Sequence, residues 1–153
     1  MTIRMRAATK DDLVAIVTLF TYPDIDGRQK NDALGPPLPR EYEAAFENLA
    51  RDPNNTVWLA ELDGAVVGIF QLTFIQYLAN HGARVAMIEN VVVAPDVRGR
   101  GIGETMMRWA MDEARRAGCS RIQLTSHKLR TRAHTFYERL GFTATHEGFK
   151  LLL

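Results

Sequence analysis

The sequence lacks the features that would tie the protein to a disulfide framework, a membrane or a secretion route. It contains a single cysteine, Cys119, so an intramolecular disulfide and a cysteine metal cluster are both excluded. No apolar run approaches the roughly 20 residues of a membrane-spanning helix, and residues 1–20 have no signal-peptide core. We therefore expect a cytoplasmic protein in which Cys119 is a small core or helix-end residue rather than a nucleophile.

Two further absences concern charge and histidine. Nineteen Lys and Arg are balanced by 18 Asp and Glu, giving a formal net charge of +1, whereas a general nucleic-acid binder needs a larger basic excess. The four histidines show no H-x-x-x-H spacing, so no metal site is indicated. With 46% hydrophobic and 24% charged residues, the composition is that of a globular protein, and we expect residues 1–153 to form a single domain.

What the chain does contain is a glycine-rich loop between a β-branched run and a helical pattern, VVVAPDVRGRGIGE at 91–104. Its glycines are expected to permit positive φ and a close approach of the backbone to a ligand. A helix that starts near Ile102 presents unpaired N–H groups, and two arginines add positive charge. The loop is therefore predicted to bind a phosphate. The residues concerned are Arg98, Gly99, Arg100, Gly101, Ile102, Gly103 and Glu104.

Other interpretations of this loop fit less well. A dinucleotide-binding G-x-G-x-x-G would need a third glycine where Glu104 or Met106 stands. A Walker loop requires a Gly-Lys pair, and the chain has none. A plain connecting turn needs neither three glycines nor two arginines.

Apolar periodicity and turn residues predict a mixed order of strands and helices. The strongest signal is a hairpin turn at Asp63-Gly64, and the strand that precedes the glycine loop is expected to lie parallel to the strand that follows the next helix. The strands are expected at 2–8, 56–62, 65–75, 84–93 and 121–125, with one or two more in 142–152. Helices are expected at about 13–20, 40–52, 102–117 and 130–140, and 21–39 is expected to be a loop.

With strand, R-x-x-G-x-G loop and helix in this order, the chain resembles the GNAT acyl-CoA N-acyltransferases. A second signature, Phe-Tyr-Glu-Arg-Leu-Gly-Phe at 136–142, matches the F-Y-x-x-x-G-F motif of that family. The resemblance covers the whole chain in element order, but only 88–142 carries specific motifs. It implies an α/β (α+β) GNAT fold with a mixed central sheet of six to seven strands and about four flanking helices.

The resemblance also implies how the co-substrate acetyl-CoA is held. In the family, the fourth strand pairs through its backbone with the pantetheine arm, which here means Val91, Val92 and Val93. The main-chain N–H groups of the loop from Gly99 to Glu104 would hold the pyrophosphate, with Arg98 opening the motif. Many members have an asparagine where this chain has Arg130, which either pairs with a CoA phosphate or is a solvated charge at the helix start.

Two residues are predicted to move protons. Tyr137 occupies the position of the family's general acid and is favoured for that role, with a core aromatic residue as the alternative. Glu89 interrupts an apolar strand, and strict alternation would place it on the face of Val91 and Val93, where partial desolvation would make it a stronger base. A structural ion pair or an outward turn at a bulge is the alternative for Glu89, and His127 is a competing base.

The sequence says less about the amine that accepts the acetyl group. The family usually builds the acceptor pocket from segments that correspond here to 22–39 and 77–84, where acids at 24, 26 and 32 are most simply solvated loop charges. Short matches at 52–54, 133–134 and 146–150 resemble small-molecule N-acetyltransferases, including aminoalkylphosphonate-type enzymes. We therefore expect a small amine, with a protein N-terminus or lysine, or a non-catalytic acyl-CoA-binding regulator, as alternatives. The apolar C-terminal residues, Phe149 and Leu151 to Leu153, suggest the edge of a homodimer.

Overall fold

A hairpin forms the centre of the sheet. In the computed structural model, which describes residues 1–28 and 35–153, β2 (Asn55–Leu62) and β3 (Ala65–Gln76) pair antiparallel. Both residues of the connecting turn have positive φ, 51° at Asp63 and 82° at Gly64, as a type I′ turn requires. The predicted hairpin is confirmed.

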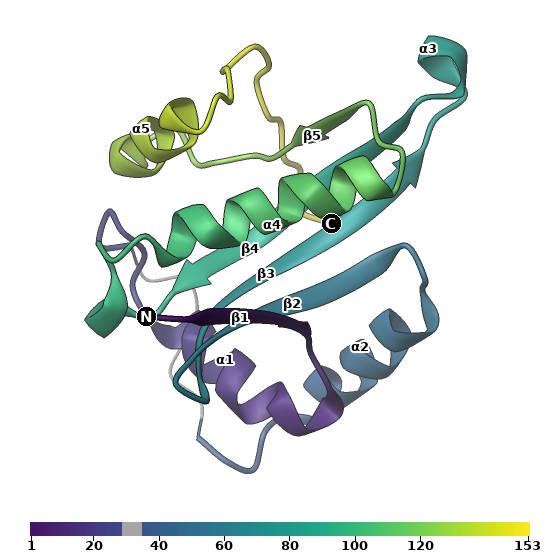
Figure 1. Cartoon of the computed structure of the whole chain (residues 1–153). Coiled ribbons are helices and arrows are strands. Elements are labelled where there is room, and N and C mark those ends of the chain that lie inside the picture. Colours follow the sequence, from purple (N-terminus) through teal and green to yellow (C-terminus); the bar gives the residue numbers. More distant parts are fainter. Residues whose placement is uncertain (29–34) are drawn as a thin grey trace.

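The other strands flank this hairpin in the order β1-β2-β3-β4-β5 (Figure 1). β1 (Ile3–Ala7) pairs antiparallel with β2, and β4 (Arg84–Val93) pairs antiparallel with β3. β5 (Arg121–Gln123) runs parallel to β4, as its connection through a helix predicts. The sheet is therefore mixed, and the expected fold class is confirmed.

The strand count is lower than expected. Among the described residues the sheet has five strands, and the one or two strands expected in 142–152 are absent. After Phe142 the chain forms no ladder with β5, and its last apolar residues lie almost wholly in solvent. A pattern of apolar residues makes a strand only where it pairs with a neighbouring backbone, and 142–152 pairs with no strand of the described sheet.

Helices cover both faces of the sheet. α4 (Ile102–Arg116) packs on the face that carries Trp58, whose ring meets Trp109 edge-on at 5.5 Å between centroids. The neighbouring Val57 points to the opposite face, where α2 (Arg40–Arg51) lies beside α1 (Leu13–Thr21) (Figure 1).

The remaining elements are short, apart from α5 (Thr131–Arg139), which follows β5. Two 3₁₀ turns, Lys10–Asp12 and Pro95–Val97, precede α1 and the glycine loop. α3 (Ala79–Gly82) is a single turn at the tip between β3 and β4. The core between these layers contains the largest fully buried side chains, among them Phe70, Leu59, Ile88, Met106 and Met107.

Candidate functional site

β4 and β5 pair only over their first residues and then separate. The ladder runs from Val85 opposite Arg121 to Met87 opposite Gln123, while β4 itself continues to Val93. Beyond Met87, the edge of β4 that faces away from β3 has no strand partner in the described part of the chain. An extended ligand could therefore add to this edge through main-chain hydrogen bonds. The half-buried Val91, Val92 and Val93 lie in this stretch.

A bulge interrupts β4 within the same stretch. Asn90 has a φ of 53°, and the register with β3 shifts between the pairs Gln71–Glu89 and Ile69–Val92. The bulge inserts one residue and so changes which side chains share a face. Glu89 therefore lies on the face of Val92, and strict alternation, which placed it with Val91 and Val93, was wrong.

Glu89 is also exposed, so the expected partial desolvation of its carboxylate was wrong. None of the ion pairs between described residues involves Glu89, which removes one of the two structural explanations for it. The second explanation, a bulge, is present. The carboxylate remains open to a solute that approaches the bulge of β4.

The glycine loop delivers an uncapped helix N-terminus. Gly101 is the N-cap of α4 with a φ of 80°, and the first helical hydrogen bond runs from the Thr105 N–H to the Gly101 carbonyl, 3.0 Å apart. No side chain caps this end of the helix. The N–H groups of the first turn are therefore available to an anion, and the dipole of a 15-residue helix favours one. The buried side chain of Ile102 anchors this turn in the core.

The three glycines of the loop serve two purposes. Gly99 and Gly101 have φ values of 76° and 80°, and a Cβ at either would meet nothing within 4 Å, so their role is conformational. Gly103 is part of α4, and positive φ was wrongly expected for it. A Cβ there would lie 3.3 Å from the Phe136 ring and 3.8 Å from Val93. Gly103 thus allows α5 to pack closely against the start of α4.

The charged side chains of the loop are used differently from one another. Arg98 points inward, donating through Nε to the Val93 carbonyl at 2.9 Å and through Nη2 to the Pro23 carbonyl at 2.6 Å. Arg100 is exposed. Glu104 accepts two hydrogen bonds from Arg108, at 2.9 and 2.7 Å, which draws its carboxylate along the helix. Of the two arginines, Arg100 alone is directed to solvent beside the helix N-terminus.

Tyr137 lies on α5 within an aromatic cluster. Its ring packs edge-on against Phe136 at 5.2 Å and Phe142 at 5.9 Å, and the residue is 9% exposed. Burial raises the pKa of the phenol above its ordinary value of 10.0, and the charge of Arg130 opposes this shift. Tyr137 is therefore both a core aromatic residue and a phenol that stays protonated at neutral pH.

Arg130 is neither solvated nor directed to the glycine loop. Its Nε lies 2.9 Å from Asp24 Oδ2, with side-chain exposures of 13% for Arg130 and 6% for Asp24. Asp26 accepts hydrogen bonds from the N–H groups of Arg132 and Ala133, at 3.1 and 3.4 Å. The interpretation of positions 24 and 26 as solvated loop charges was therefore wrong. Asp32 lies outside the described residues.

His127 is poorly placed to act as a base. Its Nδ1 accepts from the Leu129 N–H at 3.2 Å and lies 3.2 Å from Arg28 Nη1. Partial desolvation and then the positive charge of Arg28 lower the pKa of His127, so the ring is neutral at pH 7. A neutral imidazole that accepts at Nδ1 carries its proton on Nε2, which leaves no lone pair for an incoming amine.

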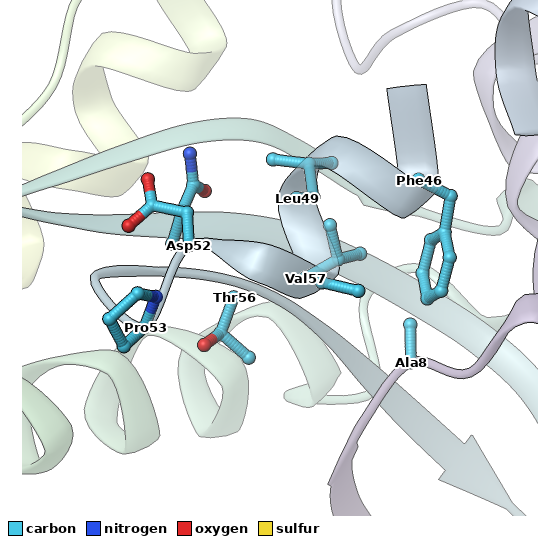
Figure 2. Close-up of a pocket in the computed structure, with 9 residues that line it drawn as sticks. Ala8, Phe46, Leu49, Asp52, Pro53, Thr56 and Val57 are labelled. Carbon is cyan, nitrogen blue, oxygen red and sulfur yellow. The ribbon is translucent and has the colours of Figure 1, made fainter. Parts of the chain in front are cut away.

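Two other surfaces lie away from the glycine loop. The tip at 77–84 stands at the start of β4, about 30 Å from Val93 at the rise of a ten-residue strand, and its expected part in the acceptor pocket stays a prediction. Figure 2 shows a cavity of about 250 Å³ between α2 and the start of β2. Its lining combines apolar side chains, among them Phe46, Leu49 and Val57, with the polar Asp52, Asn55 and Thr56, and none of the lining residues belongs to the glycine loop.

These features fit a ligand that combines an extended amide chain with a diphosphate. The chain would add to the open edge of β4, and the diphosphate would occupy the start of α4. Ser126, just beyond β5, has a buried Oγ with no hydrogen-bond partner among the described residues, as expected if a ligand completes the site. Within the described ranges, no group of His, Cys, Asp and Glu could hold a metal ion and no helix could span a membrane.

Comparison with known proteins gives a consistent assignment. Residues 22–142 match the model of the acetyltransferase (GNAT) family. An aminoalkylphosphonate N-acetyltransferase of Salmonella typhimurium is 36% identical over 112 residues, 71% of this chain and 72% of its own length. A glucosamine 6-phosphate N-acetyltransferase of Trypanosoma brucei is 33% identical over 88 residues, 58% of each chain.

Solved structures superpose on nearly the whole chain. A crystal structure of a protein described as a transcriptional regulator from Bacillus halodurans superposes with a TM-score of 0.92 at 39% identity, over 99% of this chain and 100% of that chain.

Proposed function

Since the chain belongs to the GNAT acetyltransferase family and is an acyltransferase, we propose that it transfers the acetyl group of acetyl-CoA to the primary amine of a small molecule. The observation that carries this proposal is the uncapped N-terminus of α4 beside the open edge of β4. We assign the whole activity to one domain, residues 1–153. Acetyl-CoA supplies an activated thioester, which an uncharged amine can attack.

Different residues would bind the different chemical parts of acetyl-CoA. The backbone of Val91 to Val93 would pair with the amides of the pantetheine arm. The N–H groups from Gly99 to Glu104 would hold the pyrophosphate, with Arg100 adding charge. Arg98 and Arg130 would act by ordering the surrounding chain, because their guanidinium groups already contact Val93 and Asp24.

Two proton movements complete the reaction. A cationic amine must lose a proton before it attacks, and we assign its acceptance to Glu89, directly or through a water molecule. The departing thiolate must gain a proton, and we assign its donation to the hydroxyl of Tyr137. The raised pKa of this phenol supports the assignment, because a general acid must be protonated before the step.

Replacing Glu89 with Gln tests the base. We expect the variant to lose the alkaline rise of kcat/KM while keeping its affinity for acetyl-CoA, because the amide cannot accept the amine proton. The measurement is a pH profile of kcat/KM for the amine. Glu47, an exposed carboxylate on α2 that pairs with Lys10, supplies the matched control Glu47→Gln. A variant profile that rises as in the wild type would remove Glu89 from the mechanism.

The acceptor class is tested by turnover of a panel. We expect release of free CoA thiol with small primary amines, including aminoalkylphosphonates and amino sugar phosphates, and little with peptides. The relatives that carry these acceptors in their names support the choice. Turnover of N-terminal or lysine peptides alone would overturn it in favour of protein acetylation.

A second candidate is an acyl-CoA-binding regulator, which the name of the Bacillus halodurans protein favours. A regulator would bind acetyl-CoA without transferring its acetyl group. If acetyl-CoA raises the Tm of the protein but no amine or peptide releases free thiol, the regulator replaces the enzyme.

We further propose a cytoplasmic homodimer that forms through the C-terminal segment. Phe149 and Leu151 to Leu153 have exposures of 83% to 117%, far from the behaviour of apolar residues in a monomer. We expect the wild type to have twice the mass of one chain in light scattering. Leu151→Glu should lower the measured mass toward that of a single chain. Leu78→Glu, at a residue 98% exposed on the distant tip, should leave the mass unchanged. A monomeric wild type would contradict the proposal.

A further inference from the structure

The loop that follows α1 is connected by hydrogen bonds and an ion pair to the start of α5. Residues 22–28 reach the start of α5 across about a hundred positions of sequence, where they contact the N-cap residue Arg130 and the first-turn residues Arg132 and Ala133. We propose that Asp26 is a positioning residue for Tyr137: it caps α5 from this loop and thereby fixes where the helix presents the phenol. The proposal rests on the acetyl transfer proposed above.

α5 has no cap of its own. Its N-cap residue is Arg130, whose side chain makes no capping hydrogen bond, and its first turn contains no acidic residue. The carboxylate of Asp26 takes this place, with Oδ1 accepting from the Arg132 N–H and Oδ2 from the Ala133 N–H. A carboxylate at a helix N-terminus satisfies orphan donors and interacts favourably with the helix dipole.

Further contacts make the loop a firm support for this cap. Asp24 pairs with Arg130 in a nearly buried ion pair, and its Oδ1 accepts the N–H groups of Asp26 and Arg28, both at 2.9 Å. Arg132 Nη1 donates to the Ile25 carbonyl at 3.1 Å. The cap is thus held by a turn that is itself closed by hydrogen bonds.

The same loop is tied to β4. Arg98 donates to the carbonyls of Pro23 and Asp24, and its Nε donates to the carbonyl of Val93. A continuous set of contacts therefore runs from the end of β4, through the loop, to the first turn of α5. Together with the packing of Phe136 on Gly103, this set holds the helix that carries the phenol against the end of β4.

The expected effect on catalysis follows from the distance along α5 between the cap and Tyr137. Tyr137 lies about two turns beyond the cap, and Phe136 holds the helix against Gly103 at that level. Loss of the cap would leave the middle of α5 packed but release its first turns to fray or tilt. Proton transfer depends steeply on the placement of the donor, so kcat should suffer more than binding.

The test is a double-mutant cycle with kinetic readout. We expect Asp26→Ala to lower kcat about tenfold with a KM for acetyl-CoA within about twofold of the wild type. Asp26→Asn should recover most of the loss, because an asparagine also caps helices. In a Tyr137→Phe background, Asp26→Ala should have no further effect on kcat. Asp112→Ala, which removes an exposed carboxylate paired with Arg115 on α4, is the control and should change nothing.

Additive losses in the cycle, or a loss that falls on KM alone, would overturn the positioning role. Hydrogen exchange of the α5 amides supplies a measurement that does not depend on turnover. Asp26→Ala should speed exchange in 131–139, and Asp112→Ala should not. If no acceptor is turned over, the proposed function fails. Hydrogen exchange then tests by itself whether Asp26 caps α5. Unchanged exchange overturns the cap even if the enzyme is active.

Discussion

Tyr137→Phe is expected to lower kcat by about a hundredfold or more, because general acid catalysis contributes 10² to 10⁴ to such reactions. The substitution removes the hydroxyl and keeps the ring that packs against Phe136 and Phe142. We therefore expect the Tm and the Kd for acetyl-CoA to stay near those of the wild type. Steady-state kinetics at saturating amine measures kcat, thermal unfolding measures the Tm, and calorimetry measures the Kd.

The pH dependence provides a second readout for Tyr137. Because burial raises the pKa of the phenol, the protonated form persists above pH 10 and wild-type kcat should not fall until the pH exceeds the ordinary phenol value. The phenylalanine variant should lack that fall. Full activity of the variant would leave Tyr137 as a core aromatic residue and nothing more.

Gly101→Val is expected to weaken binding of acetyl-CoA by about tenfold or more. A β-branched residue is strongly disfavoured at a φ of 80°, so the backbone would leave the left-handed region and turn the first N–H groups of α4 away from an anion. A Cβ at Gly101 would meet nothing within 4 Å, so the expected strain lies in the backbone conformation. Calorimetric titration with acetyl-CoA measures the change.

Gly118 offers a matched control for this experiment. It follows the other end of α4 with a φ of 75° and equally open space around it. Gly118→Val should cost a similar stability, about 1 to 2 kcal/mol, while acetyl-CoA binds as in the wild type. Equal losses of affinity in the two variants would show that strain, and not the loop geometry, weakens binding.

Much of the fold could be predicted because its signals are local. The Asp63-Gly64 turn fixes a hairpin without reference to the rest of the chain, and the loop at 98–103 with its following helix is a strong local pattern. The strands predicted in the C-terminal segment were wrong because their formation depends on distant parts of the chain. Whether Phe149 and its neighbours form a strand depends on a hydrogen-bonding partner elsewhere, which a sequence pattern does not specify.

In the candidate site, too, features with local sequence signals could be predicted and features that depend on distant residues could not. The glycine loop and Tyr137 were predicted from motifs, and their roles stay predictions. The face of Glu89 was misassigned because a single left-handed residue, Asn90, reverses the alternation beyond it. Asp26 was missed as a helix cap because its partners, Arg132 and Ala133, lie about a hundred residues away. The acid at position 26 was a visible signal, but charge alone does not distinguish a cap from a solvated side chain.

The contact between Gly103 and Phe136 bears on how such a chain can change during evolution. The two motifs that identify the family touch each other here, with space at Gly103 for a hydrogen atom and an aromatic ring but not for a methyl group without movement. Substitutions at the two positions are therefore coupled. A lineage that gains alanine at 103 should reduce the side chain at 136, so the pair is expected to covary among relatives as one unit.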